Sequence, residues 1–225
     1  MKDIKRYAIY FAPRAGSFAD AAASWLGWDP CRGVDVAHPV LAADLPSLTA
    51  EPRKYGFHGT IKPPFRLAEG VDAAGAEAAV GALARRLQPV QMPGLALVSL
   101  EGFLALVPKG DTTRLADLAA EVVERLDPLR APLTEAEMAR RRPDRLTLRQ
   151  QELLNSFGYP YVMEEFRFHL TLSGGLTDEQ MALLHPLAHS HFAAHQPEPF
   201  VLDDLCLFGE AEDGRFHLLH RYALG

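Results

Sequence analysis

The sequence predicts a duplicated α+β fold in which two similar halves each contribute one strand to a shared site. The first observation is a repeated motif. Residues 55–65 contain Phe-His-Gly-Thr and residues 166–173 contain Phe-His-Leu-Thr, and each is followed by an aliphatic residue. The second is spacing, since the two copies lie about half a chain apart in 225 residues. The third is that each copy precedes the same series of elements: a turn, a helical stretch, a proline and an apolar strand-turn-strand.

The first half begins with a strand over residues 6–12, a stretch that is rich in aromatic and aliphatic residues and stops at Pro13. Tyr7, Ile9 and Phe11 share the face expected in the core. Tyr10 lies on the other face, either as an ordinary half-buried residue or beside a ligand. The elements expected next are a helix over 17–28, a surface loop over 32–54, the motif strand ended by Pro63-Pro64, a helix over 72–87, and strands over 95–100 and 103–107.

The second half begins with a helix over 111–126, whose apolar residues recur at three- and four-residue steps. Residues 128–160 have no counterpart in the first half and are expected to form an inserted helical connection. Its arginine run over 140–142 either closes over a phosphate or is a solvated face. The other elements expected are a helix over 146–157 ended at Gly158, the second motif strand, a helix from 178 interrupted at Pro186, and strands over 200–208 and 215–222.

Length and composition indicate one domain over 1–225 with two lobes, approximately 1–110 with the first motif and 111–225 with the second. The contents of 48% hydrophobic and 23% charged residues are those of a globular protein. A net charge of -6 argues against binding long nucleic acid over a basic surface and leaves room for small anionic ligands. Two cysteines, no apolar signal region and no apolar run of membrane length predict a cytoplasmic protein with no membrane contact. Nothing in the sequence indicates the oligomeric state.

Strand parity makes each motif a candidate site. Side chains alternate between the faces of a strand, so His58 and Thr60 point the same way, as do His169 and Thr171. The same parity adds a cation to each pair, Lys62 beside Thr60 and Arg167 beside His169. Tyr55 and Tyr10 are the further candidates for binding a substrate. Imidazoles, hydroxyls and cations on one surface indicate a site for an anion.

Two facing imidazoles can open a phosphate ester without a metal. A histidine has a pKa of about 6.5, so near neutral pH one ring can take a proton from water while the other gives a proton to the leaving oxygen. Thr60 and Thr171 would donate hydrogen bonds to the non-bridging oxygens of the phosphate. The alternative is that both histidines are buried strand residues bonded to neighbouring hydroxyls. No metal and no cofactor are expected, because the four histidines over 185–195 fall on different sides of a helix.

At these residues the sequence resembles the two-histidine (2H) phosphoesterase superfamily, whose signature is a pair of His-x-Thr/Ser motifs, one in each lobe. The opening strand Arg-Tyr-Ala-Ile-Tyr and the two motif stretches are more closely similar to a bacterial branch named for phosphonate metabolism and encoded with carbon-phosphorus lyase pathways. The resemblance implies a pseudo-two-fold fold with two antiparallel sheets flanking a central groove and helices outside. It also implies that His58, Thr60, His169 and Thr171 are the catalytic residues.

The function expected is that of a metal-independent cyclic phosphodiesterase, a phosphoric diester hydrolase that opens a small cyclic phosphate. In the phosphonate context the candidate substrate is ribose 1,2-cyclic phosphate bearing a 5-phosphate. One alternative is a 2',3'-cyclic phosphodiesterase or ligase-like enzyme that acts on RNA ends. The other is a nucleotide-binding module without turnover, although binding alone does not need two matched imidazoles. Which histidine is the acid stays open.

Overall fold

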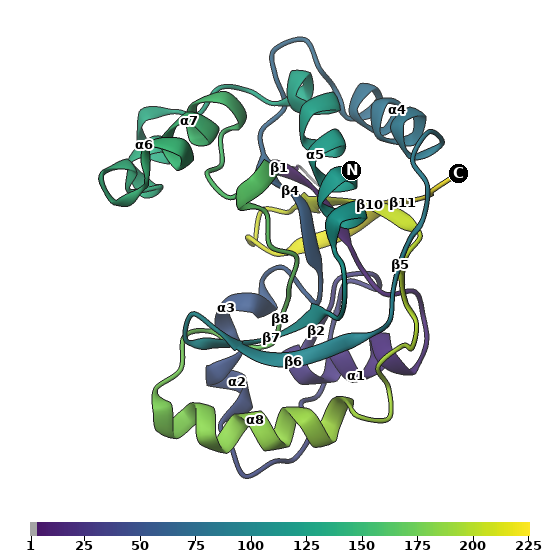
Figure 1. The fold of residues 1–225 in the computed structure, drawn as a ribbon, viewed down its shortest axis with the longest axis vertical. Helices are drawn as coiled ribbons and strands as arrows, with labels where there is room; N and C mark the ends of the chain where they lie inside the picture. The colour runs from purple at the N-terminus through teal and green to yellow at the C-terminus, as the bar shows by residue number, and fades with distance from the viewer. Residues whose placement is uncertain (1–3) are drawn as a thin grey trace.

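The two Phe-His-x-Thr stretches lie next to each other in the middle of one seven-stranded sheet, in a computed structural model that describes residues 4–225 (Figure 1). Every pairing in the sheet is antiparallel. Across the sheet the strands are β11 (Phe216–Ala223), β10 (Asp204–Glu210), β1 (Arg6–Phe11), β4 (Gly59–Phe65), β8 (Leu170–Thr171), β7 (Phe103–Pro108) and β6 (Leu95–Leu100). The predicted α+β class with antiparallel strands is confirmed.

The two sheets expected from the sequence are continuous through a single register pair, in which Gly59 of β4 lies opposite Leu170 of β8. Each hairpin that follows a motif pairs with the other part of the sheet. The pair β6–β7 follows the first motif in the chain but lies beside β8, and β10–β11 follows the second motif but lies beside β1. The spatial halves of the sheet therefore differ from the predicted lobe ranges 1–110 and 111–225.

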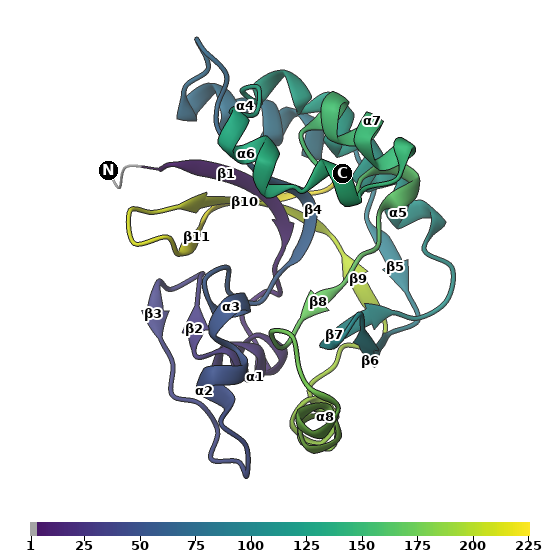
Figure 2. The ribbon, with the colours of Figure 1, turned by 90° about the vertical axis from the view of Figure 1, so that its left-hand side faces the viewer.

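Some of the helices pack against the curved sheet, and other helices lie around it (Figure 2). The helices are α1 (Ser17–Leu26), α2 (Leu45–Leu48), α3 (Ala50–Arg53), α4 (Ala73–Ala84), α5 (Thr113–Arg125), α6 (Glu135–Arg140), α7 (Leu148–Phe157) and α8 (Asp178–Phe192). Helices α4 and α5 pack on the part of the sheet with β4, β10 and β11, and α8 packs on β6 and β7. Two short pairs, β2 (Trp28–Asp29) with β3 (Val34–Asp35) and β5 (Val90–Met92) with β9 (Phe200–Leu202), complete the strands.

Strand β1 divides the apolar residues between two clusters, as its parity predicted. Tyr7, Ile9 and Phe11 belong to the main core beneath the helices. Tyr10 belongs to a smaller cluster on the opposite face, together with Phe208 and Phe216 of β10 and β11. The second cluster therefore lies on the face of the sheet opposite the main core.

Three predictions about local structure are wrong. Residues 32–54 are not one loop, because Asp44 accepts a hydrogen bond from the Ser47 amide and starts α2, which is followed by α3. Helix α8 passes through Pro186 without interruption, since the burial of its apolar face offsets the hydrogen bond that proline cannot donate. Strand β4 continues through Pro63-Pro64 to Phe65, because β8 pairs with it only at Gly59 and leaves that edge without a partner strand.

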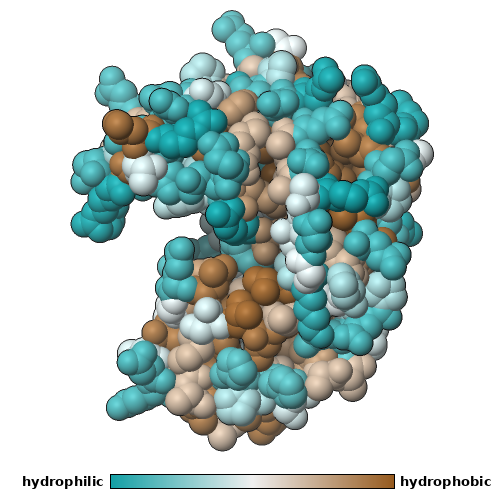
Figure 3. Space-filling view, in the orientation of Figure 1, coloured by the Kyte–Doolittle hydropathy of each residue, from teal (hydrophilic) through white to brown (hydrophobic). Residues whose placement is uncertain are grey.

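The inserted connection is helical, as predicted. Helices α6 and α7 project from the sheet and form one rim of a notch in the molecular surface (Figures 1 and 3). Helix α7 ends at Gly158, whose φ of 72° is the left-handed cap predicted from the sequence. Within residues 4–225, none of the helices is both long enough and apolar enough to cross a bilayer.

Candidate active site

The register of β4 against β8 brings the two motifs together. Gly59 lies opposite Leu170. Extending this antiparallel pair by one residue in each direction puts His58 opposite Thr171 and Thr60 opposite His169. Directly opposite side chains lie about 5 Å apart and diagonal neighbours about 7–8 Å apart. The two imidazoles therefore occupy one diagonal of a four-residue square and the two hydroxyls occupy the other.

Glycine is required at the centre of the first motif but not of the second. A Cβ atom at Gly59 would lie 2.3 Å from Cζ of Phe168, which is the phenylalanine of the other motif. Phe168 is buried and belongs to the main core. The close approach of β4 to this ring explains why the variable position of Phe-His-x-Thr is glycine in one copy and Leu170 in the other.

The two histidines are held by equivalent hydrogen bonds. Nδ1 of His58 lies 2.9 Å from the carbonyl oxygen of Gly56, and Nδ1 of His169 lies 2.8 Å from the carbonyl oxygen of Arg167, in each case two residues earlier. A carbonyl oxygen can only accept, so Nδ1 must carry the proton in both rings. Nε2 is then the atom available to a ligand, as an acceptor in the neutral ring and a donor in the charged ring.

Aromatic rings pack against both imidazoles. The ring of His58 lies 4.0 Å from that of Tyr10 and 5.6 Å from that of Tyr55, centroid to centroid. Phe103 of β7 lies 5.7 Å from His169. Removal from water lowers the pKa of His58 to about 4, the hydrogen bond to the Gly56 carbonyl opposes this, and the charge of His169 lowers it further. His58 is therefore neutral near pH 7, and the electrostatic coupling agrees with the closeness of the two rings.

A cavity of about 390 Å³ opens over this square. Residues of α3 and of the insertion line it from opposite sides, which corresponds to the notch in Figure 3. Three of the four motif residues line it: His58, Thr60 and Thr171. His169 is outside this lining, but it packs on Phe103, which does line the cavity. Tyr10 and Tyr55, the further candidates for binding a substrate, also line it.

Lys62 does not enter this cavity, contrary to the parity prediction. The register against β1 shifts within the motif strand, so Thr60 lies opposite Tyr10 whereas Lys62 lies opposite Ile9. Since Tyr10 faces the groove and Ile9 faces the core, the β-bulge at Ile61 turns Lys62 to the helix side. A parity argument fails wherever one extra residue enters a strand.

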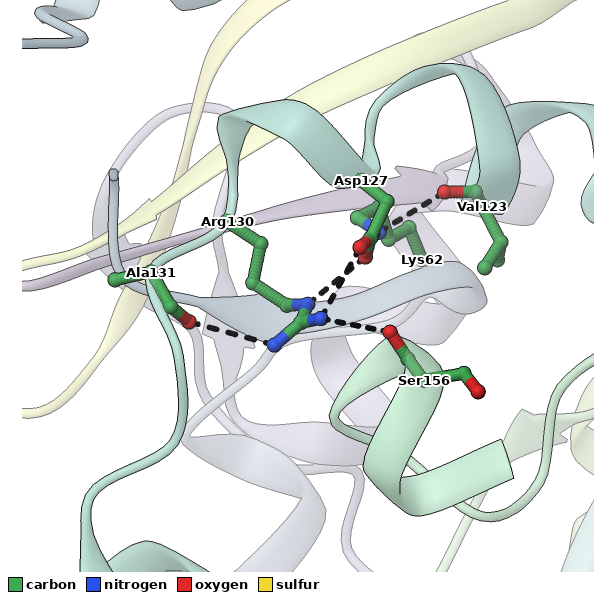
Figure 4. Close-up of polar contacts among 6 residues, drawn as sticks. All are labelled: Lys62, Val123, Asp127, Arg130, Ala131 and Ser156. Carbon is green, nitrogen blue, oxygen red and sulfur yellow. Dashed lines mark hydrogen bonds and ion pairs between the residues drawn. The ribbon is translucent and has the colours of Figure 1, made fainter. Parts of the chain in front are cut away.

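The ammonium group of Lys62 is instead part of a polar network that joins β4 to the insertion (Figure 4). Its Nζ donates to the carbonyl oxygen of Val123 at 3.1 Å and lies 3.2 Å from the Asp127 carboxylate. Arg130 binds the same carboxylate through Nε and Nη2 and donates to the carbonyl oxygen of Ser156 in α7. Burial lowers the pKa of Lys62 to about 8, although Asp127 opposes that change.

Arg167 also lies outside the cavity lining. Its guanidinium group is exposed and donates to the carbonyl oxygens of Glu164 and Phe166. The parity that placed it beside His169 assumed a regular strand, but β8 contains only Leu170 and Thr171. Residue 167 therefore belongs to the irregular segment before the strand.

Two groups at the cavity were missed. Arg141 of the insertion and Tyr159 after α7 line it, and the guanidinium carbon of Arg141 lies 4.8 Å from the Tyr159 ring centroid. The only signal for Arg141 was the arginine run over 140–142, for which a solvated face was one of the two readings. Arg6 lines the cavity as well, but its guanidinium group is paired with Glu210 at 2.5 Å.

Comparisons with known proteins add a family and several relatives. The family described as "Protein of unknown function (DUF1045)" matches residues 60–217. A protein of Janthinobacterium sp. (strain Marseille) is 36% identical over 226 residues, covering 95% of this chain and 49% of its own length, and one of Laribacter hongkongensis (strain HLHK9) is 38% identical over 216 residues, covering 93% and 49%. Both are named ribose 1,5-bisphosphate phosphokinase PhnN. The chain thus spans about half the length of these relatives.

Solved structures with a similar trace include E. coli LigT complexed with NADP+, with a TM-score of 0.46 and 14% identity over 99% of this chain and 98% of that one. LigT complexed with 3'-AMP gives a TM-score of 0.46 at 15% identity over 99% of each chain. A structure titled as a phosphoesterase gives 0.44 at 16% identity, again over 99% of each chain.

Proposed function

The chain belongs to the DUF1045 family, and we propose that it is a metal-independent cyclic phosphodiesterase whose reaction takes place between its two His-x-Thr motifs. The observation that carries the proposal is the single register pair between Gly59 and Leu170, because it sets two imidazoles and two hydroxyls around one point. The spacing of about 7–8 Å between diagonal side chains admits a phosphate group between the rings. A buried structural pair would not need both Nδ1 atoms bonded to carbonyls with Nε2 left for a ligand.

The environment of His58 supports a proposal for the roles that the sequence left open. A ring with a pKa of about 4 is neutral near pH 7, so Nε2 of His58 accepts a proton from the attacking water. The water oxygen bonds to phosphorus, the ester bond to the leaving oxygen breaks, and protonated His169 gives its Nε2 proton to that oxygen. Thr60 and Thr171 donate hydrogen bonds to the non-bridging oxygens as negative charge develops. The product is a phosphomonoester with a freed hydroxyl.

The substrate we propose is a small cyclic phosphate, with ribose 1,2-cyclic phosphate bearing a 5-phosphate as the first candidate. The motif stretches resemble a branch named for phosphonate metabolism, and the two curated relatives carry the name of a phosphorylated ribose. The net charge of -6 favours a small ligand over long RNA. The kinase activity in the relatives' name belongs to proteins about twice as long and is not transferred to this chain.

Phosphorus NMR tests the proposal directly. The purified protein, with a chelator present, receives ribose 1,2-cyclic phosphate 5-phosphate and 2',3'-cyclic nucleotides in parallel. The variants are His58→Ala and His169→Ala, with His189→Ala as the matched control, because His189 is an exposed histidine on α8. Turnover abolished by the first two substitutions and retained in the control supports the proposal. Preference for the 2',3'-cyclic ends would favour the RNA-end alternative, and activity that survives both substitutions contradicts a two-histidine mechanism.

A further inference from the structure

A second cavity of about 270 Å³ lies directly beside the histidine cavity, between the end of β4 and the insertion. The two cavities share lining residues, namely Arg6, Tyr55, Pro63, Pro64 and Arg141. They are therefore two parts of one depression, and a ligand can extend from one into the other. Nothing in the two-histidine reaction uses this second space.

Arginines dominate the lining of the second cavity, namely Arg6, Arg66, Arg130, Arg140 and Arg141, and Lys62, which Asp127 binds, also lines it. Three of them are neutralised by carboxylates: Arg6 by Glu210, Arg66 by Glu137 and Arg130 by Asp127. Within residues 4–225, Arg140 and Arg141 have no carboxylate within ion-pair distance. Glu137 lines the cavity, but Arg66 binds it and holds its pKa at about 2. The cavity consequently carries unbalanced positive charge and suits an anion.

Arg141 has the geometry of a ready anion ligand. It is half-buried, and its guanidinium group lies over the face of Tyr159 at 4.8 Å from the ring centroid. This contact gives its N–H groups no acceptor, and no hydrogen-bond acceptor is found for them among the residues that the structure describes. A planar fork of donors held in one orientation matches two oxygens of a phosphate group. An ordinary solvated arginine would not be held between two cavities in this way.

The wall that carries Arg141 is fixed to the motif strand. Arg130 donates to the Ala131 and Ser156 carbonyl oxygens and binds Asp127, which also holds Lys62 of β4 (Figure 4). This network ties the C-terminal end of α7 to the strand that carries Thr60. The arginine cavity is thereby held at a constant position relative to the reacting centre.

We propose that the arginine cavity is a binding subsite for a second phosphate group, with Arg141 as its principal ligand. This rests on the proposed function for the reacting phosphate and adds the site that recognises the terminal phosphomonoester of a small cyclic phosphodiester. The subsite holds the terminal phosphate while the cyclic phosphate lies between His58 and His169. Specificity for a doubly phosphorylated substrate follows from this arrangement.

The first experiment measures binding without turnover. Isothermal titration calorimetry at fixed ionic strength compares ribose 5-phosphate with ribose on the wild type, Arg141→Ala, Arg141→Lys and Arg145→Ala. Arg145 is an exposed arginine on the same insertion outside both cavities, so Arg145→Ala is the matched control. We expect ribose 5-phosphate to bind, Arg141→Ala to weaken binding at least tenfold, Arg141→Lys to weaken it less, and Arg145→Ala to leave it unchanged. Equal binding by the wild type and Arg141→Ala overturns the subsite.

The second experiment measures specificity as a ratio of kcat/KM values. Phosphorus NMR gives kcat/KM for a cyclic ribose phosphate with the 5-phosphate and for the same compound without it. The first value divided by the second is expected to fall at least tenfold in Arg141→Ala and to stay constant in Arg145→Ala. If neither substrate turns over but the binding of ribose 5-phosphate still depends on Arg141, the proposed function fails and the subsite stands. If both turn over and the ratio is the same in Arg141→Ala, the subsite fails and the proposed function stands.

Discussion

Removing Lys62 and removing its partner Asp127 should have very different effects on stability. Asp127 also binds Arg130 through two hydrogen bonds of 2.8 and 3.1 Å, so it keeps a partner when Lys62 is lost. Lys62, with 2% of its side chain exposed, keeps no carboxylate partner among residues 4–225 when Asp127 is lost. Breaking a buried pair by removing one member costs about 3–5 kcal/mol when the other charge is left unpaired.

The size of the effect follows from the environment of the ammonium group. Burial lowers the pKa of Lys62 from 10.5 to about 8, which corresponds to about 3 kcal/mol at ~1.4 kcal/mol per pH unit. Lys62→Met removes this penalty together with the hydrogen bonds to Val123 and Asp127, so the free energy of unfolding should change by no more than about 1 kcal/mol. Asp127→Ala should lower it by about 3–5 kcal/mol.

Urea denaturation at pH 7 tests the difference, and a pH series adds a second check. The unfolded chain keeps the Lys62 proton up to about pH 10.5 and the folded chain only up to about pH 8. Between these values the unfolded state binds more protons, so the wild type should gain stability relative to Lys62→Met as the pH rises through this window, by up to about 3 kcal/mol. Equal losses in Lys62→Met and Asp127→Ala at pH 7, or no relative gain towards pH 10.5, would refute the reasoning.

Two further predictions concern the motifs themselves. The ring protons of His58 should titrate in NMR with a midpoint near pH 4, so the acid-side fall in kcat/KM should lie near that pH. Tyr55→Ala should move this midpoint up, and a wild-type midpoint near 6.5 contradicts the burial argument. Gly59→Ala should destabilise the protein by about 1–3 kcal/mol in urea denaturation, because the new Cβ atom would lie 2.3 Å from Phe168. Gly175→Ala is the control: no atom lies within 4 Å of its new Cβ, so stability should change by less than about 0.5 kcal/mol. Equal effects of the two alanines would show that the strands can separate without cost.

The sequence was sufficient to predict which face of each motif strand carries the histidine. Two copies of Phe-His-x-Thr place an apolar residue on each side of the histidine, and burial of Phe57, Phe168 and Leu170 in the main core leaves His58 and His169 on the opposite face. Periodicity also located α5 and the end of α7 at Gly158. These features depend on local patterns that extend over several residues.

The position of Lys62 could not be predicted in the same way. A bulge depends on how β4 pairs with β1, and nothing in the sequence of one strand states the register of its neighbour. The same limit applies to the hairpins, since β6–β7 and β10–β11 are recognisable locally but their partners are set by tertiary packing. Arg141 sits just after α6, a helix of six residues without a buried face, so no apolar stripe could orient it.

The most direct test of the central claim is whether His58 and His169 act as one unit on one phosphate. Phosphorus NMR gives kcat/KM for His58→Ala, His169→Ala and the double variant on whichever cyclic phosphate the wild type opens. Each single substitution should lower kcat/KM by about 10²–10⁴-fold. The effects of substituting residues that act together are not additive, so the double variant should be no slower than the slower single variant. Multiplied losses in the double variant, or wild-type activity in either single variant, would contradict the account.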